Sequence, residues 1–162
     1  MPKFRAFLKY WLPPLIWMVV IFSASADSKS ADHSSRYFEP LLRWLFPRMS
    51  PELVGQIHYG FRKCCHLAEY AVLALLLWRA IRRTAGNNLR RSAAQKCGTS
   101  GWKWAEAGLA LSVVFLYGAS DEIHQAFVPD RTGQISDVLV DTLGGAIGLL
   151  ALWIAGRWRK HW

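Results

Sequence analysis

Charged and polar side chains recur at helical spacing inside long apolar stretches of this chain. Lys63, His66 and Tyr70 follow one another at intervals of three and four residues, and Glu69 lies three residues after His66. Residues at these spacings share a face of an α-helix, so the four side chains are expected to gather near one end of a helix. An ammonium group, an imidazole and a carboxylate in this arrangement can bind an anion or transfer a proton.

Two later apolar stretches carry further carboxyl and amide groups at a spacing of four, or beside such a stripe: Tyr117, Asp121, Glu122, His124 and Gln125 in one, Asp137 and Asp141 in the other. An ionised carboxylate that faces lipid is costly, so these groups are expected to turn inward, where they pair with one another or line a wet cavity. The bases that can meet them are Lys63, His66 and Arg131, which leaves an acidic surplus. Arg131 stands in a short turn, 128–134, and is predicted to lie over the mouth of the cluster.

These residues form the predicted site. The ligand-binding set is Lys63, His66, Tyr70, Tyr117, Asp121, Gln125, Arg131, Asp137 and Asp141. Catalytic roles stay unassigned, and the candidates for an acid or a base are His66, Glu69, Asp121, Glu122 and Asp137. We commit to no metal site, because the chain contains no dense two-histidine motif. The cofactor stays unknown.

Four apolar runs must position these groups, and they predict an all-α integral membrane bundle. The chain has 162 residues, the length of one domain, and 52% of them are hydrophobic. A membrane-spanning helix needs about 20 residues. We predict one domain, 1–162, with transmembrane helices at about 7–26, 62–82, 104–127 and 135–156, an outer segment at 27–61 and a loop at 83–103.

The distribution of charge orients these helices. Thirteen of the 20 Lys and Arg residues fall in 1–9, in 79–103 or after the last run, and Glu106 is the one acid predicted on the same side. Because cytoplasmic segments carry the excess of cations, the loop and both termini are predicted to be cytoplasmic. A basic surface for nucleic acid would not explain why the other acids all lie on the opposite side, so we expect no nucleic-acid partner.

The segments before the second run admit alternatives. The first run ends in Ala24-Ser25-Ala26, a pattern typical of signal cleavage, but Pro13-Pro14 favours a retained, kinked span. Within 27–61, apolar residues near helical spacing predict an interfacial amphipathic helix on the outer leaflet. Ser50-Pro51-Glu52 is typical of a helix start, either of the second span itself or of a separate loop helix.

The motifs also resemble a known family. The segment Tyr117-Gly118-Ala119-Ser120-Asp121-Glu122-Ile123-His124-Gln125-Ala126-Phe127-Val128-Pro129-Asp130-Arg131, followed by Asp137-Val138 and 144–148, resembles the signature of VanZ-like membrane proteins, and Lys63-Cys64-Cys65-His66-Leu67-Ala68-Glu69-Tyr70 is similar to the second-helix pattern of that family. The resemblance implies an envelope role and an association with low-level teicoplanin resistance. Asp141 stands where the family commonly has a small or amide residue, which makes this cluster more acidic.

We therefore expect a multi-pass protein of the cytoplasmic (inner) membrane. The leading hypothesis is an outward-facing site that binds, or also processes, an anionic lipid or a lipid-linked cell-wall precursor and influences glycopeptide susceptibility. Its partners would be membrane lipids and such precursors, with a homo-oligomer or an envelope-enzyme partner as open alternatives. Three other hypotheses remain: a metal-dependent or acid/base membrane enzyme, a small cation-coupled transporter, and a structural subunit whose charged cluster locks the helices together.

Overall fold

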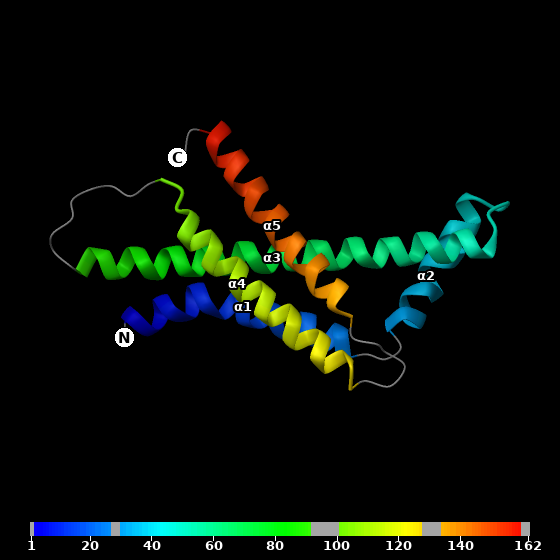
Figure 1. The fold of residues 1–162 in the computed structure, drawn as a ribbon, viewed down its shortest axis with the longest axis horizontal. Coiled ribbons are helices and arrows are strands. Elements are labelled where there is room, and N and C mark those ends of the chain that lie inside the picture. The colour runs from blue at the N-terminus through cyan, green and yellow to red at the C-terminus, as the bar shows by residue number, and fades with distance from the viewer. Residues whose placement is uncertain (1, 27–29, 92–100, 128–133, 160–162) are drawn as a thin grey trace.

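The computed structural model describes residues 2–26, 30–91, 101–127 and 134–159, and within these ranges the regular structure is entirely α-helical (Figure 1). The helices are α1 (Pro2–Ala26), α2 (Ser30–Leu45), α3 (Pro51–Arg91), α4 (Trp104–Gln125) and α5 (Ile135–Trp158). The prediction of an all-α chain is confirmed for these residues. The first turn of α1 and the last turn of α5 lie toward the same end of the molecule as the end of α3 (Figure 1).

The longest element, α3, is the axis on which the other helices pack. It is one continuous helix of 41 residues, about 60 Å long at about 1.5 Å per residue. It therefore takes in the last part of the predicted outer segment 27–61 and the first part of the predicted loop 83–103. Ser50 supplies the start, since its hydroxyl accepts a bond from the Leu53 N–H at 3.3 Å. Gly55 and Gly60 do not break the helix, because an exposed glycine costs only about 1 kcal/mol there.

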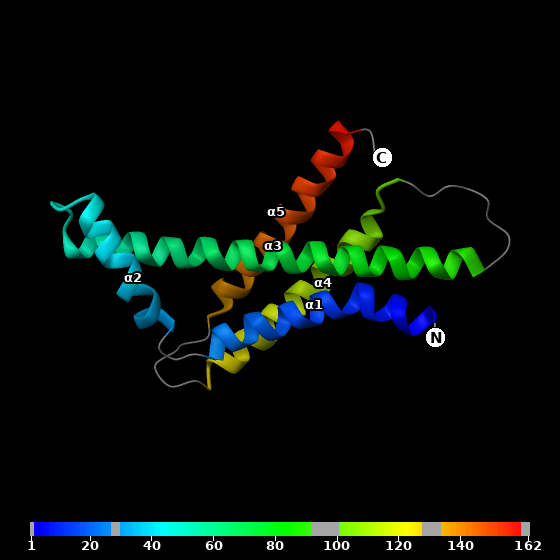
Figure 2. The ribbon, with the colours of Figure 1, turned by 180° about the vertical axis from the view of Figure 1, so that it is seen from behind.

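The first helix, α1, remains helical through Pro13 and Pro14, and it changes direction along its length (Figure 2). A proline inside a helix removes one backbone hydrogen bond and bends the chain. Two side-chain bonds hold α1 against its neighbours. The Trp17 indole donates to the Glu69 carbonyl of α3 at 2.9 Å, and the Tyr117 hydroxyl of α4 donates to the Met18 carbonyl at 2.5 Å. The first helix is thus part of the bundle.

The closest helix contact joins α5 to α3 and depends on two glycines. A Cβ on Gly144 would lie 2.4 Å from the Leu67 carbonyl oxygen, and one on Gly148 would lie 3.0 Å from the Ala71 Cα. This pair of small residues lets the two backbones approach closely. A common hydrophobic core joins α3, α4 and α5. It includes Tyr70, Leu73, Ala74, Ala110, Val114 and Leu149.

The second helix, α2, confirms that the segment after the first run contains a helix. Phe38 stacks on Phe61 of α3 with ring centroids 4.6 Å apart. Leu41, Trp44 and Leu45 are exposed. An exposed apolar face of this kind suits the surface of a membrane.

Three helices of the described residues are long and apolar enough to cross a membrane: Phe7–Ser25, Pro51–Gly86 and Ile135–Trp158. The remaining predicted span, 104–127, corresponds to α4, which is long enough at 22 residues. Glu106 near its start, and Asp121 and Glu122 near its end, shorten its apolar stretch. Two of these charged residues, Asp121 and Glu122, also belong to the site that the sequence predicts.

Candidate functional site

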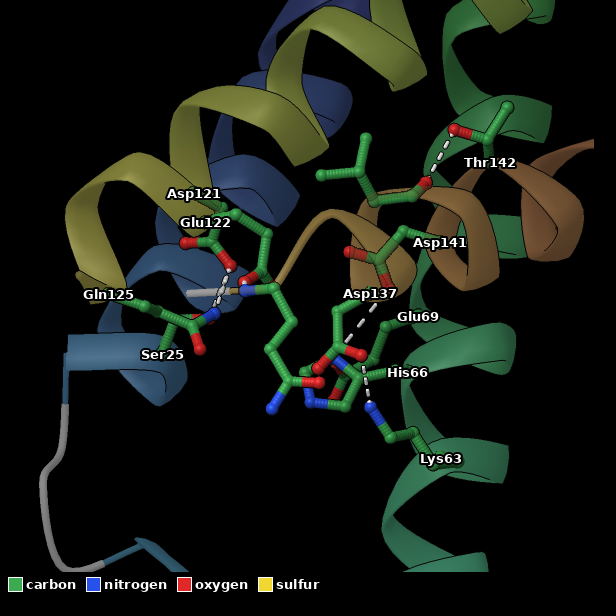
Figure 3. A network of polar contacts seen from close by, with 12 residues as sticks. Ser25, Lys63, His66, Glu69, Asp121, Glu122, Gln125, Asp137, Asp141 and Thr142 are labelled. Carbon is green, nitrogen blue, oxygen red and sulfur yellow. Dashed lines mark hydrogen bonds and ion pairs between the residues drawn. The ribbon is translucent and has the colours of Figure 1, made fainter. Parts of the chain in front are cut away.

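Four helices bring polar side chains together at one end of the bundle, as Figure 3 shows. We call this group the polar cluster; its members are Ser25 of α1, Lys63, His66 and Glu69 of α3, Asp121, Glu122 and Gln125 of α4, and Asp137 and Asp141 of α5. The predicted meeting of α3, α4 and α5 is therefore present in the structure. The contribution of α1 was not predicted.

The inner half of the polar cluster, Ser25, Asp121 and Gln125, is buried and closely bonded. The Ser25 hydroxyl donates to Asp121 Oδ2 at 2.7 Å, and the Gln125 amide nitrogen donates to the same oxygen at 2.9 Å. Only 1% of Asp121 is exposed. One carboxylate oxygen thus joins α1 to α4. This is a structural role, and loss of the bonds would lower stability, because a buried acceptor without hydrogen-bond donors costs free energy of folding.

The open half of the cluster, Lys63, His66, Glu69 and Asp137, is partly exposed. The Lys63 ammonium donates to Asp137 Oδ1 at 2.5 Å, and their side chains are 24% and 30% exposed. This pair joins α3 to the first turn of α5, where a carboxylate is also favoured by the helix dipole. The open half therefore contains positive and negative side chains that are accessible from outside the protein.

His66 lies between two carboxylates without touching either closely. Its Nδ1 is 3.8 Å from Glu69 Oε2 and 3.9 Å from Asp141 Oδ1. Both separations exceed a hydrogen bond, and no group of the described residues lies within bonding distance of Nδ1. The imidazole is therefore positioned for charge interaction with both acids and has an unused polar atom.

Tyr70 and Asp141 close the cluster toward the core. Tyr70 is completely buried, and Asp141 is 3% exposed. Both lie against Gly118 of α4, where an added Cβ would be 3.6 Å from the Tyr70 ring and from the Asp141 carboxylate. The Tyr117 hydroxyl is engaged by α1, as described above, and its ring lies 6.2 Å from that of Tyr70.

Glu122 connects the cluster to a surface pocket between α4 and α5. Its Oε2 accepts the backbone N–H of Gln134 at 2.8 Å, just before α5 begins. The carboxyl group also lines a pocket of about 400 Å³ whose other walls are mostly apolar: Phe115, Ala119, Ile123, Ala126, Gln134, Ile135, Val138 and Leu139. An apolar hollow thus lies beside a charged group, as a ligand with a tail and a head would require.

The polar cluster contains carboxyl groups, an imidazole and an ammonium group, side chains that can bind charged ligands or transfer protons. Among the residues that the structure describes, no three His, Cys, Asp or Glu side chains form a group that could hold a metal ion. His124, which the sequence places beside the acidic stripe, stacks on Phe22 of α1 with ring centroids 4.4 Å apart. This contact gives His124 a packing role at the edge of the bundle.

A family model described as VanZ/LLP1 matches residues 10–156. The chain belongs to the VanZ/LLP1 family. No curated protein and no solved structure matches it. Together with the three apolar helices, the VanZ/LLP1 assignment identifies a membrane protein. The resemblance drawn from the motifs around Lys63 and Asp121 is confirmed, and the match extends it to α1 and α2.

Compared with the predicted site, the polar cluster of this VanZ/LLP1 chain contains Ser25 in addition and does not include Tyr70, Tyr117 or Arg131. Arg131 lies outside the described residues. Ser25 was missed, because its small-residue context suggested a cleavage signal. A usable indication was present: Pro14, Ile21 and Ser25 are buried at intervals of seven and four residues, which marks one inward-facing stripe on α1.

Proposed function

We propose that this VanZ/LLP1 protein binds the anionic head group of a lipid at its polar cluster, from the outer leaflet of the inner membrane. It does so as a multi-pass protein with four spans, at about 7–26, 62–82, 104–127 and 135–156, and with both termini in the cytoplasm. The lipid class is an anionic phospholipid or a lipid-linked cell-wall precursor. Because the protein belongs to the VanZ/LLP1 family, the proposal also includes an influence on glycopeptide susceptibility.

The observation that carries the proposal is the open half of the cluster beside an apolar pocket. The Lys63 ammonium is partly exposed and held by Asp137, while the pocket that Glu122 lines is walled by apolar side chains. An anionic head group would compete with Asp137 for the ammonium, and a lipid tail would occupy the pocket. His66 lies between two acids and its side chain is 30% exposed, so it is the group that we propose to exchange a proton with the bound head group.

Native mass spectrometry of the gently purified protein tests the proposal. The wild-type protein should retain an anionic lipid, and Lys63→Gln should bind that lipid about tenfold more weakly or worse. The reason is that the substitution removes one charge-assisted bond, which contributes about 1.4 kcal/mol or more. Lys103→Gln is the matched control, because it removes a partly exposed lysine at the opposite end of the bundle. Equal retention by wild type and Lys63→Gln would refute binding at the cluster.

Topology has its own test. In a Cys64→Ala, Cys65→Ala background, an impermeant thiol reagent added to intact cells should modify an added Ser50→Cys, since Ser50 is exposed at the start of α3. It should spare Cys97, which lies outside the described residues. Modification of Cys97 in intact cells would reverse the proposed orientation.

A second candidate function, a structural network, is favoured by the inner half alone. Asp121 already accepts two bonds from Ser25 and Gln125, so it serves the bundle without any ligand. In this case Asp121→Asn would lower the melting temperature while the Lys63→Gln protein kept its lipid content. Loss of teicoplanin tolerance in a Lys63→Gln strain with normal protein abundance would instead favour ligand binding.

A further inference from the structure

A second charged site lies at the end of the bundle opposite the polar cluster, between α1 and the last third of α3. Three cationic groups surround the ring of Tyr10: Lys9 Nζ at 5.7 Å, Arg79 Cζ at 5.8 Å and Arg83 Cζ at 5.9 Å from its centroid. All three side chains are exposed. The position of α1 is fixed next to this ring, because the Trp11 indole donates to the Thr84 hydroxyl at 3.0 Å.

Positive charges around one ring repel one another, and a bound anion would relieve this repulsion. Arg79 and Arg83 are four residues apart on α3, a spacing at which like charges repel. Among the residues that the structure describes, the acid at this end is Glu106, and its carboxylate faces Arg82 at 3.8 Å and Lys103 at 3.9 Å. The charges around Tyr10 therefore have no carboxylate at their centre within the described part of the chain.

The surroundings indicate where this anion comes from. Tryptophans follow one another across the same end, with 5.1 Å between the ring centroids of Trp78 and Trp102 and 5.7 Å between those of Trp102 and Trp104. Of these rings, Trp104 is 64% exposed, and exposed tryptophan rings prefer the head-group level of a bilayer. Immediately after Tyr10, α1 presents exposed apolar side chains, among them Leu12, Leu15 and Ile16. A ligand bound at the three cations would thus have its charge among polar groups and its tail along α1.

We propose that Lys9, Arg79 and Arg83 bind the phosphate group of an anionic phospholipid. Two guanidinium groups offer paired N–H donors that match the oxygens of a phosphate, and the ammonium group adds a third charge. The site shares no residue with the polar cluster, so this proposal does not depend on the function proposed above. It would anchor the bundle to the leaflet on the side of the basic segments.

The test is lipid titration of the purified full-length protein, followed by native mass spectrometry. The probes are phosphatidylglycerol and phosphatidylcholine with the same acyl chains, and inorganic phosphate as a competitor. The wild-type protein should prefer phosphatidylglycerol, and the Arg79→Gln, Arg83→Gln double variant should bind it at least about tenfold more weakly. The Arg43→Gln, Arg48→Gln variant is the control, because it removes two exposed arginines at the other end.

Three results would overturn the proposal: equal loss of phosphatidylglycerol in the control variant, equal binding of phosphatidylcholine by wild type, or displacement of the lipid by an equal concentration of inorganic phosphate. The last result would assign the site to free phosphate. Should the double glutamine variant fail to fold, Arg79→Lys with Arg83→Lys keeps the charge and removes the paired donors. This variant is expected to bind more weakly than wild type, and unchanged binding would refute the role of the guanidinium groups.

Discussion

The two ends of this helical bundle hold their charges in different ways. At the polar cluster, Asp121, Glu122 and Asp137 accept direct bonds of 2.5 to 2.9 Å, from another helix, from the next turn of α4 or from the residue before α5. At the opposite end, the described ion pairs of Glu106 are 3.8 and 3.9 Å long, and arginine and lysine side chains lie over aromatic rings at 5.1 to 5.9 Å.

The difference separates charged groups that stabilise the fold from charged groups that remain available to bind a ligand. Buried, directly bonded groups such as Asp121 lose much if a partner is removed. Exposed cations over aromatic rings contribute little to stability and can turn toward a new anion at small cost. The polar cluster is therefore specific in geometry, whereas the basic end is adaptable.

The largest effect is expected at the helix contact that sets the depth of the polar cluster. Gly144→Ala places a methyl group 2.4 Å from the Leu67 carbonyl oxygen, so α3 and α5 must separate, at a cost of about 3 kcal/mol. Gly108→Ala is the control, since nothing lies within 4 Å of its added methyl group, and it should be neutral or stabilise by up to about 1 kcal/mol. Unfolding in detergent measures both. A stable Gly144→Ala protein would show that the contact is not tight.

Removal of one acid at each end tests whether the two ends differ in how much their carboxylates stabilise the fold. Asp121→Ala leaves Ser25 and Gln125 without their buried acceptor and should lower the free energy of unfolding by about 2 kcal/mol. Glu106→Ala removes two ion pairs of 3.8 and 3.9 Å, neither of them a direct hydrogen bond, and should cost less, about 1 kcal/mol. Similar losses for the two variants would contradict the distinction between the ends.

The smallest effect concerns two tryptophans of α1, one near each end. Trp17→Phe removes the part-buried bond to the Glu69 carbonyl and should cost about 1 kcal/mol. Trp11→Phe removes the exposed bond to Thr84 and should cost about half as much or less. Thermal unfolding of the two variants side by side provides the measurement, and a larger loss for Trp11→Phe would contradict the expected order.

Much of this site could be predicted from the sequence because charged residues in apolar helices must face one another. The spacing of Lys63 and His66, and of Asp137 and Asp141, fixes their helix faces, and the cost of exposure to lipid turns those faces inward. Gly144 and Gly148 likewise predict a close helix contact, because two small residues four apart lie on one face and let a second backbone approach.

Other features depend on tertiary packing that spacing does not encode. The sequence alone does not tell whether α3 breaks near Gly55 and Gly60, because a glycine is tolerated in a helix at moderate cost. Nor does it divide the acids into a buried inner half and an exposed open half. That division depends on where α1 lies, and the Ser25 bond to Asp121 is a contact between residues far apart in the chain.

The modest apolarity of α4 has a consequence for how the proposed four-span protein is made. A helix with Glu106, Asp121 and Glu122 is a poor candidate to enter a bilayer alone, since each charged residue opposes insertion. Its neighbour α5 is strongly apolar, follows it after a short connection and is tied to it through Glu122 and Gln134. We expect the two helices to be inserted as one hairpin, so that α5 carries the acids of α4 to their final depth during synthesis.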